Sequence, residues 1–176
     1  MPSNSKIIYL ARHAKSSWIS SARSDYDRPL SNRGIRDAAN MGVELKQLGW
    51  KPEVVISSPA VRATKTCRIL CESIGYSSHQ IIWDKNIYAA YMVTLLQILS
   101  HQPETTKSIM LVGHNPAMED LLLHLCGEGL WQNYAQKNGK LFTTGNIAKI
   151  SFNYSWKNLA IGDAELIKLL RPKDLS

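Results

Sequence analysis

Four side chains in this sequence have the types that phosphate chemistry needs: Arg12 and the adjacent His13, Arg62, and His114. Guanidinium groups match phosphate oxygens through paired hydrogen bonds and neutralise the charge on the non-bridging oxygens. A neutral imidazole nitrogen can act as a nucleophile. The sequence shows no P-loop and no pair of metal-binding carboxylates. These residue types therefore favour covalent phosphoryl transfer without a metal or another cofactor.

Histidines also have simpler interpretations. A lone histidine at a strand end is often a hydrogen-bonded structural residue, and His79, His101 and His124 are interpreted in that way. A zinc site built from His13, His114 and His124 is an alternative, but it lacks the short-range two-ligand spacing of the common zinc hydrolases. It would also place two arginines beside a cation. Because arginines favour an anion, the phosphate interpretation is the stronger one.

The elements that would position these residues alternate along the chain. Apolar, β-branched runs predict strands, and apolar residues at helical spacing predict helices. The expected strands are 6–11, 54–57, 80–84, 108–113, 146–152 and 164–170, of which the last could be helical, and the expected helices are 35–48, 59–74, 91–99 and 116–125. This alternation predicts an α/β fold with a mostly parallel sheet and helices on both faces. Ligands bind beyond the carboxyl ends of such strands, which is where Arg12, Arg62 and His114 would meet.

Two expected helices begin with residues typical of helix N-termini. Ser58 and Asn115 are candidate N-caps, and each is followed by a proline in the first turn, Pro59 and Pro116. A helix N-terminus attracts an anion because its first N–H groups are free. Arg62 would lie in or just after such a turn, where a cation is unfavourable by about 0.3–1 kcal/mol unless an anion binds beside it. The alternative is that Arg62 bends outward into solvent.

Composition narrows the class of protein. The 176 residues suit one domain, expected over 1–176, and 44% of them are hydrophobic, as in globular proteins. There is no apolar run of the roughly 18 residues that span a membrane and no apolar stretch of a secretory signal, so we expect a cytoplasmic location and no membrane partner. The net charge of +7 is spread along the chain, without a nucleic-acid motif. A phosphate-bearing partner explains this charge as well as nucleic acid does.

Two further groups of residues are expected to be structural. The chain has three cysteines, Cys67, Cys71 and Cys126. An odd number argues against a disulfide framework, so we expect buried thiols. Trp131 and Tyr134 lie in the sequence GLWQNYAQKNGK, which is interpreted as a polar loop. Local packing is the expected role of these two rings, and a pocket rim or a contact with a partner is the alternative.

The order of the motifs resembles a known family. LARHAKSSW resembles the R-H-G signature of the histidine phosphatase (phosphoglycerate mutase-like) superfamily. With DRPLSNRG, VVISSPAVRATKT, IMLVGHNPAMEDLLLHL, LFTTGNIAKISF and LLRPK, nearly the whole chain resembles the SixA-type phosphohistidine phosphatases. The resemblance implies a three-layer α/β/α sandwich of the phosphoglycerate mutase-like type.

The resemblance also implies a role for each matching residue. His13 matches the nucleophile that becomes phosphorylated on a ring nitrogen. Arg12 and Arg62 match the phosphate-binding arginines, and His114 matches the histidine that donates to the phosphoryl oxygens. Many members add a phosphate contact from a side chain shortly after the R-H-G element, for which the candidates here are Lys15, Ser16 and Ser17.

The chain departs from the family pattern at two points. Ala14 stands where the superfamily usually has glycine, and the inserted region that supplies a general acid in larger members is short here. Asp84 and, less favoured, Glu104 are the acidic candidates. An alkoxide leaving group needs a proton donor, whereas imidazole, with a conjugate acid near a pKa of about 6.5, leaves readily. A site without a dedicated acid therefore favours phosphohistidine over a sugar or serine phosphate.

The sequence thus predicts a metal-independent phosphatase that removes phosphate from phosphohistidine on a protein through phosphorylated His13. A phosphatase of small phosphorylated metabolites, such as sugar phosphates or nucleotides, is an alternative. A non-catalytic phosphate-binding module is another. A nucleic-acid binder would leave the paired histidines without a role. The oligomeric state is left open.

Overall fold

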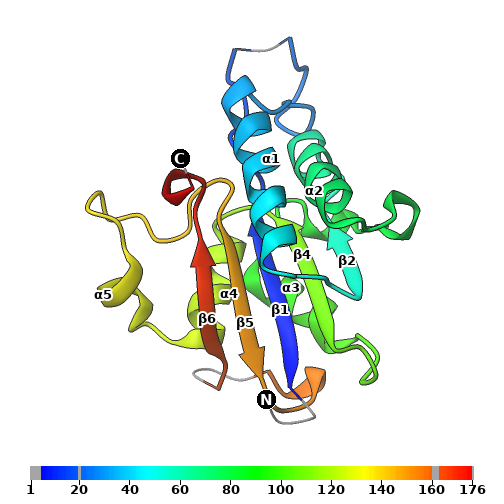
Figure 1. Ribbon diagram of the computed structural model, residues 1–176, viewed down its shortest axis with the longest axis vertical. Helices are drawn as coiled ribbons and strands as arrows, with labels where there is room; N and C mark the ends of the chain where they lie inside the picture. Colours follow the sequence, from blue (N-terminus) through cyan, green and yellow to red (C-terminus); the bar gives the residue numbers. More distant parts are fainter. Residues whose placement is uncertain (1–4, 20, 160–162, 176) are drawn as a thin grey trace.

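A six-stranded sheet forms the centre of the structure, a computed structural model that describes residues 5–19, 21–159 and 163–175 (Figure 1). The sheet order is β3-β2-β4-β1-β5-β6. The strands are β1 (Lys6–Arg12), β2 (Val54–Ser57), β3 (Ile82–Trp83), β4 (Ser108–Gly113), β5 (Ile147–Phe152) and β6 (Glu165–Leu170). The first four strands run parallel, whereas β5 is antiparallel to β1 and β6 is antiparallel to β5. The predicted mostly parallel sheet is therefore confirmed.

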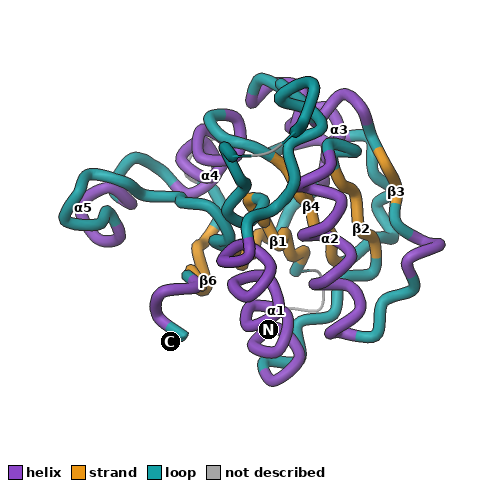
Figure 2. The backbone as a smooth tube through the Cα atoms, turned by 90° about the horizontal axis from the view of Figure 1, so that it is seen from above, coloured by secondary structure: helices purple, strands orange, loops and turns teal. Residues whose placement is uncertain are grey.

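Helices cover both faces of this sheet. α1 (Asn32–Gln47) and α2 (Val61–Ile74) lie on one face, and α3 (Met92–Ser100) and α4 (Ala117–Cys126) lie on the other (Figures 1 and 2). α5 (Leu130–Tyr134) lies to the side of β6 (Figure 2). Short 3-10 helices occur at η1 (Ser78–Gln80), η2 (Lys85–Ile87), η3 (Trp156–Asn158) and η4 (Pro172–Asp174). The arrangement is the predicted three-layer α/β/α sandwich.

The central strands are apolar throughout because both of their faces are buried. Successive side chains of a strand point to opposite faces of the sheet. In β1, Ile8 and Leu10 join the core under α3 and α4, whereas Tyr9 and Ala11 join the core under α1 and α2. All four are at most 5% exposed. Two packed cores therefore hold the end of β1, and the residues that follow it, in place.

The start of α1 is fixed against the loop that follows β1. Ser31 caps the helix, since its Oγ accepts a hydrogen bond from the Gly34 N–H at 3.0 Å. The backbone N–H and the hydroxyl of Ser31 both donate to the carbonyl oxygen of Lys15, at 2.9 and 3.0 Å. A Cβ atom on Gly34 would lie 2.1 Å from that same oxygen, so this close approach requires glycine. The helix thus supports the backbone just beyond His13.

The predicted start of α2 is wrong by two residues. The helix begins at Val61 with Ala60 as its N-cap, so Ser58 and Pro59 precede it. Ser58 Oγ accepts from the Ala60 N–H at 3.3 Å and lies 2.8 Å from Nε2 of His114. Ser58 therefore binds the Ala60 backbone and the His114 ring, and it does not cap the helix.

The predicted start of α4 is also wrong. The helix begins at Ala117 with Pro116 as its N-cap, after a cis peptide bond between Asn115 and Pro116. Asn115 does not cap the helix, because its Nδ2 donates to the carbonyl oxygen of Phe142 at 2.9 Å. In both places the side chain expected at the helix end is bound to a residue distant in sequence.

Segments outside the central strands differ more from the prediction. β3 comprises only Ile82–Trp83, whereas the strand was expected over 80–84. The strand expected over 164–170 is confirmed as β6, and its helical alternative is wrong. The segment expected to be a polar loop contains α5. Trp131 and Tyr134 are partly buried against the core, as expected. A helix of five residues is too short to show helical periodicity in the sequence.

The cysteines are free thiols. Cys67 and Cys71 are at most 1% exposed, and their sulfur atoms lie 4.0 Å apart on α2. Cys126 is partly buried. The prediction of buried thiols is confirmed for the first two. No helix in the described part of the chain is long and apolar enough to cross a membrane.

Candidate active site

The four candidate residues lie together at the carboxyl ends of the parallel strands. β1 ends at Arg12, opposite Gly113 at the end of β4, so His13 and His114 follow at the same edge of the sheet. The His13 N–H donates to the Gly113 carbonyl oxygen at 3.0 Å, and the centroids of the two imidazole rings are 5.0 Å apart. Arg62 reaches the same place from the first turn of α2.

His13 is held with one ring nitrogen unprotonated. Its side chain is buried, and Nδ1 lies 2.7 Å from the carbonyl oxygen of Ala14, which can only accept a hydrogen bond. Nδ1 therefore carries the proton, and Nε2 has a lone pair that accepts from Arg62 Nε at 3.3 Å. Burial, together with the nearby charges, lowers the pKa of His13 to about 3. The imidazole is neutral at pH 7, as a nucleophile must be.

His114 is arranged with its other nitrogen free to donate. Burial first, and then the positive charge of Arg62, lower its pKa to about 4, so this ring is also neutral. The Ser58 hydroxyl lies 2.8 Å from Nε2. If that hydroxyl donates, Nδ1 carries the proton, and Nδ1 is a buried atom without a hydrogen-bond partner among the described residues. A phosphoryl oxygen is a suitable acceptor for it.

Arg62 is buried against Asp25, a residue for which the sequence offered no signal. Arg62 is 6% exposed, so the alternative in which it bends into solvent is wrong. Nη1 donates to the backbone oxygen of Asp25 at 2.5 Å, and Nη2 donates to its carboxylate at 2.9 Å. Asp25 also accepts from Arg28 Nη1 at 2.8 Å and from the Tyr88 hydroxyl at 3.1 Å. The carboxylate thus directs Arg62 Nε toward His13.

Tyr88 is a second residue that the sequence reasoning missed. Its ring packs edge-on against His114, with centroids 5.7 Å apart, and its hydroxyl contacts Asp25. Tyr88 follows η2 and comes from a part of the chain far from both partners. Tyr88 therefore connects His114 to Asp25, the residue that holds Arg62.

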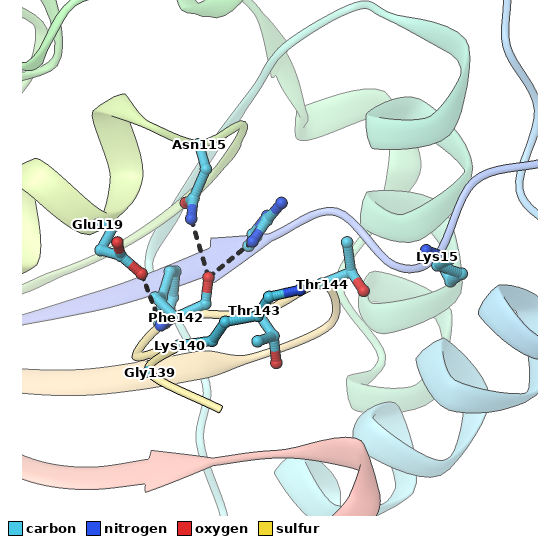
Figure 3. A pocket seen from close by; sticks show the side chains of 9 residues that line it. Lys15, Asn115, Glu119, Gly139, Lys140, Phe142, Thr143 and Thr144 are labelled. Carbon is cyan, nitrogen blue, oxygen red and sulfur yellow. Dashed lines mark hydrogen bonds between the residues drawn. The ribbon is translucent and has the colours of Figure 1, made fainter. Parts of the chain in front are cut away.

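Arg12 lies on the other side of the site and lines a hollow of about 320 Å³. Its Nη1 donates to the carbonyl oxygen of Phe142 at 2.7 Å, the same atom that Asn115 holds. Glu119 accepts from the Phe142 N–H at 2.7 Å, so these side chains converge on the backbone of one residue, Phe142 (Figure 3). Arg12 Nε is buried and has no hydrogen-bond partner among the described residues. That N–H is suited to an oxyanion.

The three candidates for a further phosphate contact occupy different places. Ser16 is buried, and its Oγ accepts from Arg28 Nη2 at 2.5 Å. Ser17 Oγ donates to the carbonyl oxygen of Ile19 at 2.9 Å. Lys15 is exposed and lines the hollow that contains Arg12. Lys15 thus lies on the Arg12 side, whereas Ser16 is joined through Arg28 to the Asp25 carboxylate that holds Arg62.

Neither acidic candidate lies among these residues. The Asp84 carboxylate accepts from the backbone and the side chain of Asn86, both at 2.8 Å, and lines a separate hollow beside α3. Glu104 forms an ion pair with Lys6 at the start of β1, which is the opposite end of the strand from Arg12. The interpretation of Glu104 as an acid of this site is therefore wrong. In the part of the chain that the structure describes, no three His, Cys, Asp or Glu side chains are grouped to hold a metal ion.

The lowered pKa values of the two histidines predict acid-sensitive stability. A histidine whose pKa is below its ordinary value of 6.5 in the folded state is protonated more readily in the unfolded state. Its stabilising contribution is complete above pH 6.5 and is lost as the pH falls toward about 4 and 3. We expect the free energy of unfolding to fall by about 1.4 kcal/mol per pH unit for each histidine in this window.

Urea unfolding at several pH values between 7.5 and 5 measures this slope. A His13→Asn variant should have a shallower slope than the wild type, whereas His79→Asn, at an exposed position, should keep it. Equal slopes for the two variants would contradict a neutral, buried His13.

Comparisons with known proteins find similar sequences and similar folds. A sequence model of the family described as the histidine phosphatase superfamily (branch 1) matches residues 8–87. A SixA structure from Agrobacterium tumefaciens, provisionally named a phosphohistidine phosphatase, has a TM-score of 0.80 and 28% identity, with 95% of this chain and 98% of that chain covered. A phosphoglycerate mutase from Plasmodium falciparum, 16% identical, shares the fold with a TM-score of 0.60, over 94% of this chain and 90% of that chain.

A relative without an assigned activity extends over the same length. An uncharacterised protein of Mycobacterium leprae is 28% identical over 167 residues, which cover 92% of this chain and 99% of that protein. The chain is thus similar to the histidine phosphatase superfamily over residues 8–87, and over nearly its whole length it has the fold of the SixA-type members, which supports a phosphatase.

Proposed function

We propose that this phosphatase acts on phosphohistidine in a protein, without a metal ion, through a phosphorylated His13. The observation that carries the proposal is the state of His13: a buried, neutral imidazole whose Nε2 lone pair faces Arg62 and whose Nδ1 is held by Ala14. The two arginines supply positive charge where a phosphoryl group would lie. The SixA-type name of a structure with this fold supports the same substrate class.

The proposed reaction has two displacement steps at phosphorus. The Nε2 lone pair of His13 attacks phosphorus, and the P–N bond to the substrate histidine breaks with its electron pair going to that nitrogen. The leaving ring departs as neutral imidazole once its other nitrogen is protonated. Water then attacks the phosphorylated His13, which releases inorganic phosphate and restores the neutral ring. Arg12, Arg62 and Nδ1 of His114 hold the non-bridging oxygens in both steps.

The acidic side chains near the site are not placed to donate a proton. This favours a substrate whose leaving group needs no proton from an acidic side chain. Desolvation raises the pKa of Asp25, but hydrogen bonds from Arg28 and Arg62 outweigh it and keep the pKa below its usual range. Asp25 is therefore a carboxylate at neutral pH and not a proton donor. The Glu119 oxygen near Arg12 accepts from the Phe142 N–H, so it presents a lone pair. An imidazole leaves without such a donor more easily than an alkoxide does.

Phosphate release from a phosphohistidine-bearing protein domain tests the proposal. It is measured with EDTA and without added metal, beside p-nitrophenyl phosphate and a panel of sugar phosphates. Release from phosphohistidine that persists in EDTA is the expected result. Release only from esters would show that the substrates are small phosphate monoesters and not phosphohistidine. Phosphate binding without turnover would identify a binding module. The single domain over 1–176, the cytoplasmic location and the absence of a nucleic-acid partner stay predictions.

Asp25 is expected to act as a positioning residue for Arg62. Asp25→Asn keeps the side-chain shape but removes the charge that pairs with Arg62, so we expect kcat/KM to fall about tenfold. The inhibition constant of inorganic phosphate should rise in parallel, because Arg62 would be less well placed for the oxyanion. Asp27→Asn, two residues away on the same loop, is the matched control.

A structural role alone predicts another outcome. If Asp25 only stabilises the loop, Asp25→Asn would lower the urea midpoint and leave the inhibition constant of phosphate unchanged. Asp25→Glu should recover part of the loss, because it restores the carboxylate.

A further inference from the structure

Two neighbouring hollows form one groove that begins at Arg12. The first, of about 320 Å³, and the second, of about 260 Å³, share four lining residues, which are Lys15, Lys140, Thr143 and Thr144. The second continues to Arg33 at the start of α1 and to Lys173 in η4. We call this continuous surface the basic groove. Figure 3 shows Lys140, Thr143 and Thr144 along one loop, with Lys15 across from them.

The charge of the basic groove is strongly unbalanced. Its charged lining residues are the five cations Arg12, Lys15, Arg33, Lys140 and Lys173 and the two anions Asp37 and Glu119. Asp37 pairs with Arg33 at 3.4 Å inside the groove, and Glu119 accepts from the Phe142 N–H, so the cations still outnumber the anions by three. The positive potential therefore extends away from the phosphoryl site along the groove.

The loop that carries Lys140 is held by its own hydrogen bonds. The Gln136 N–H donates to the Lys140 carbonyl oxygen at 2.8 Å, and the Gly139 N–H donates to the Gln136 carbonyl oxygen at 2.8 Å. Gly139 has a φ of +73°, which glycine adopts without strain. Thr143 Oγ1 donates to Asn146 Oδ1 at 3.1 Å. The groove wall is therefore formed in the free protein.

Buried polar atoms lie at the Arg12 end of the groove. Arg12 Nε and Asn115 Oδ1 are buried and have no hydrogen-bond partner among the described residues. Both residues line the first hollow, and Arg12 adjoins His13. Arg12 is the residue shared by the phosphoryl site and the groove, so a substrate held at Arg12 has the groove beside it.

We infer that the basic groove binds an acidic polypeptide segment that flanks the phosphorylated histidine of the substrate; this inference rests on the proposed function. The cations are spread along the groove and not gathered at one point, which suits an extended chain with several carboxylates better than a metabolite with one second phosphate. Lys15 and Lys140 are exposed point charges, and such cations pair with carboxylates in many orientations. The threonine hydroxyls can bind the peptide backbone.

Two phosphohistidine peptides of equal length test the inference. One carries aspartates and glutamates beside the phosphohistidine, and the other carries asparagines and glutamines in the same places. We expect wild-type kcat/KM to be about tenfold higher for the acidic peptide at low salt and the preference to shrink as salt is raised. Lys140→Ala should reduce the preference about threefold, and adding Arg33→Ala should remove most of it. Lys157→Ala, in η3 beyond the opposite end of β1, removes the same charge and should leave the preference unchanged.

A binding measurement separates failure of the inference from failure of the proposed function. Fluorescence anisotropy with a labelled acidic peptide that lacks phosphohistidine requires no turnover. No hydrolysis of either peptide would overturn the proposed function, while salt-sensitive binding that Lys140→Ala weakens would still support the groove. Equal hydrolysis of the two peptides would overturn the inference and leave the proposed function in place. Binding of a bisphosphorylated sugar, with no binding of the acidic peptide, would also overturn it.

Discussion

Replacing His13 with alanine is expected to lower kcat for phosphate release by roughly 10⁴-fold or more, the size of loss that removal of a covalent nucleophile causes. In the structure, Nε2 of His13 is the unprotonated ring nitrogen that faces Arg62. His114 cannot replace it, because its Nε2 is occupied by Ser58 at 2.8 Å. Without His13, the arginines still bind phosphate but no group forms the covalent intermediate.

Acid-quench and base-quench trapping of the enzyme during turnover measures this effect directly. Wild-type protein should carry an acid-labile, base-stable phosphoryl group, and His13→Ala should carry none. The His101→Ala variant, at an exposed histidine, is the matched control and should behave as the wild type. Circular dichroism and the urea midpoint show whether the variant is folded. A folded His13→Ala protein that still turns over, or still becomes phosphorylated, would overturn the mechanism.

Replacing Arg62 with lysine is expected to lower kcat/KM by roughly 10²- to 10³-fold although the charge is kept. Arg62 uses three nitrogens at once: Nε contacts His13, and Nη1 and Nη2 hold Asp25. A lysine ammonium is a single point charge that cannot make this fork. Because the Asp25 carboxylate would attract it, we expect the ammonium to move away from His13 and from the phosphoryl oxygens.

The matched control lies on the same helix. Arg68 is exposed on α2, and its guanidinium lies 5.7 Å from the ring centroid of Trp83, so Arg68→Lys should change kcat/KM by less than about twofold. Steady-state kinetics and the inhibition constant of inorganic phosphate are measured for both variants, Arg62→Lys and Arg68→Lys. Wild-type values for Arg62→Lys would show that one positive charge is enough and that the fork geometry does not matter.

The parts of the fold that the sequence predicted well are those whose cause is local. β1, β2 and β4 are apolar runs because both of their faces are buried, and α1 shows helical spacing because only one face packs on the sheet. The parallel arrangement then follows from the alternation of strands and helices. β3 and α5 were predicted poorly because two and five residues are too few to show a period.

The helix starts show where local reasoning stops. Ser58 and Asn115 have the right residue types for N-caps, but Ser58 binds His114 and Asn115 binds the carbonyl oxygen of Phe142. These contacts join residues 56 and 27 positions apart in the sequence. The choice between capping a helix and holding the site is therefore made by tertiary contacts.

The sequence by itself determined which groups can handle phosphate and at which strand ends they lie, because strand period and residue type are local properties. Only the tertiary structure decided how those groups are charged and aimed. His13 is neutral because the folded chain buries it, and its Nε2 is unprotonated because the backbone turn brings the Ala14 oxygen to Nδ1. Asp25 became part of the site because a loop folds over α2 and brings its carboxylate to Arg62. Burial and long-range pairing depend on the packing of the whole chain, so residue type and spacing alone do not reveal them.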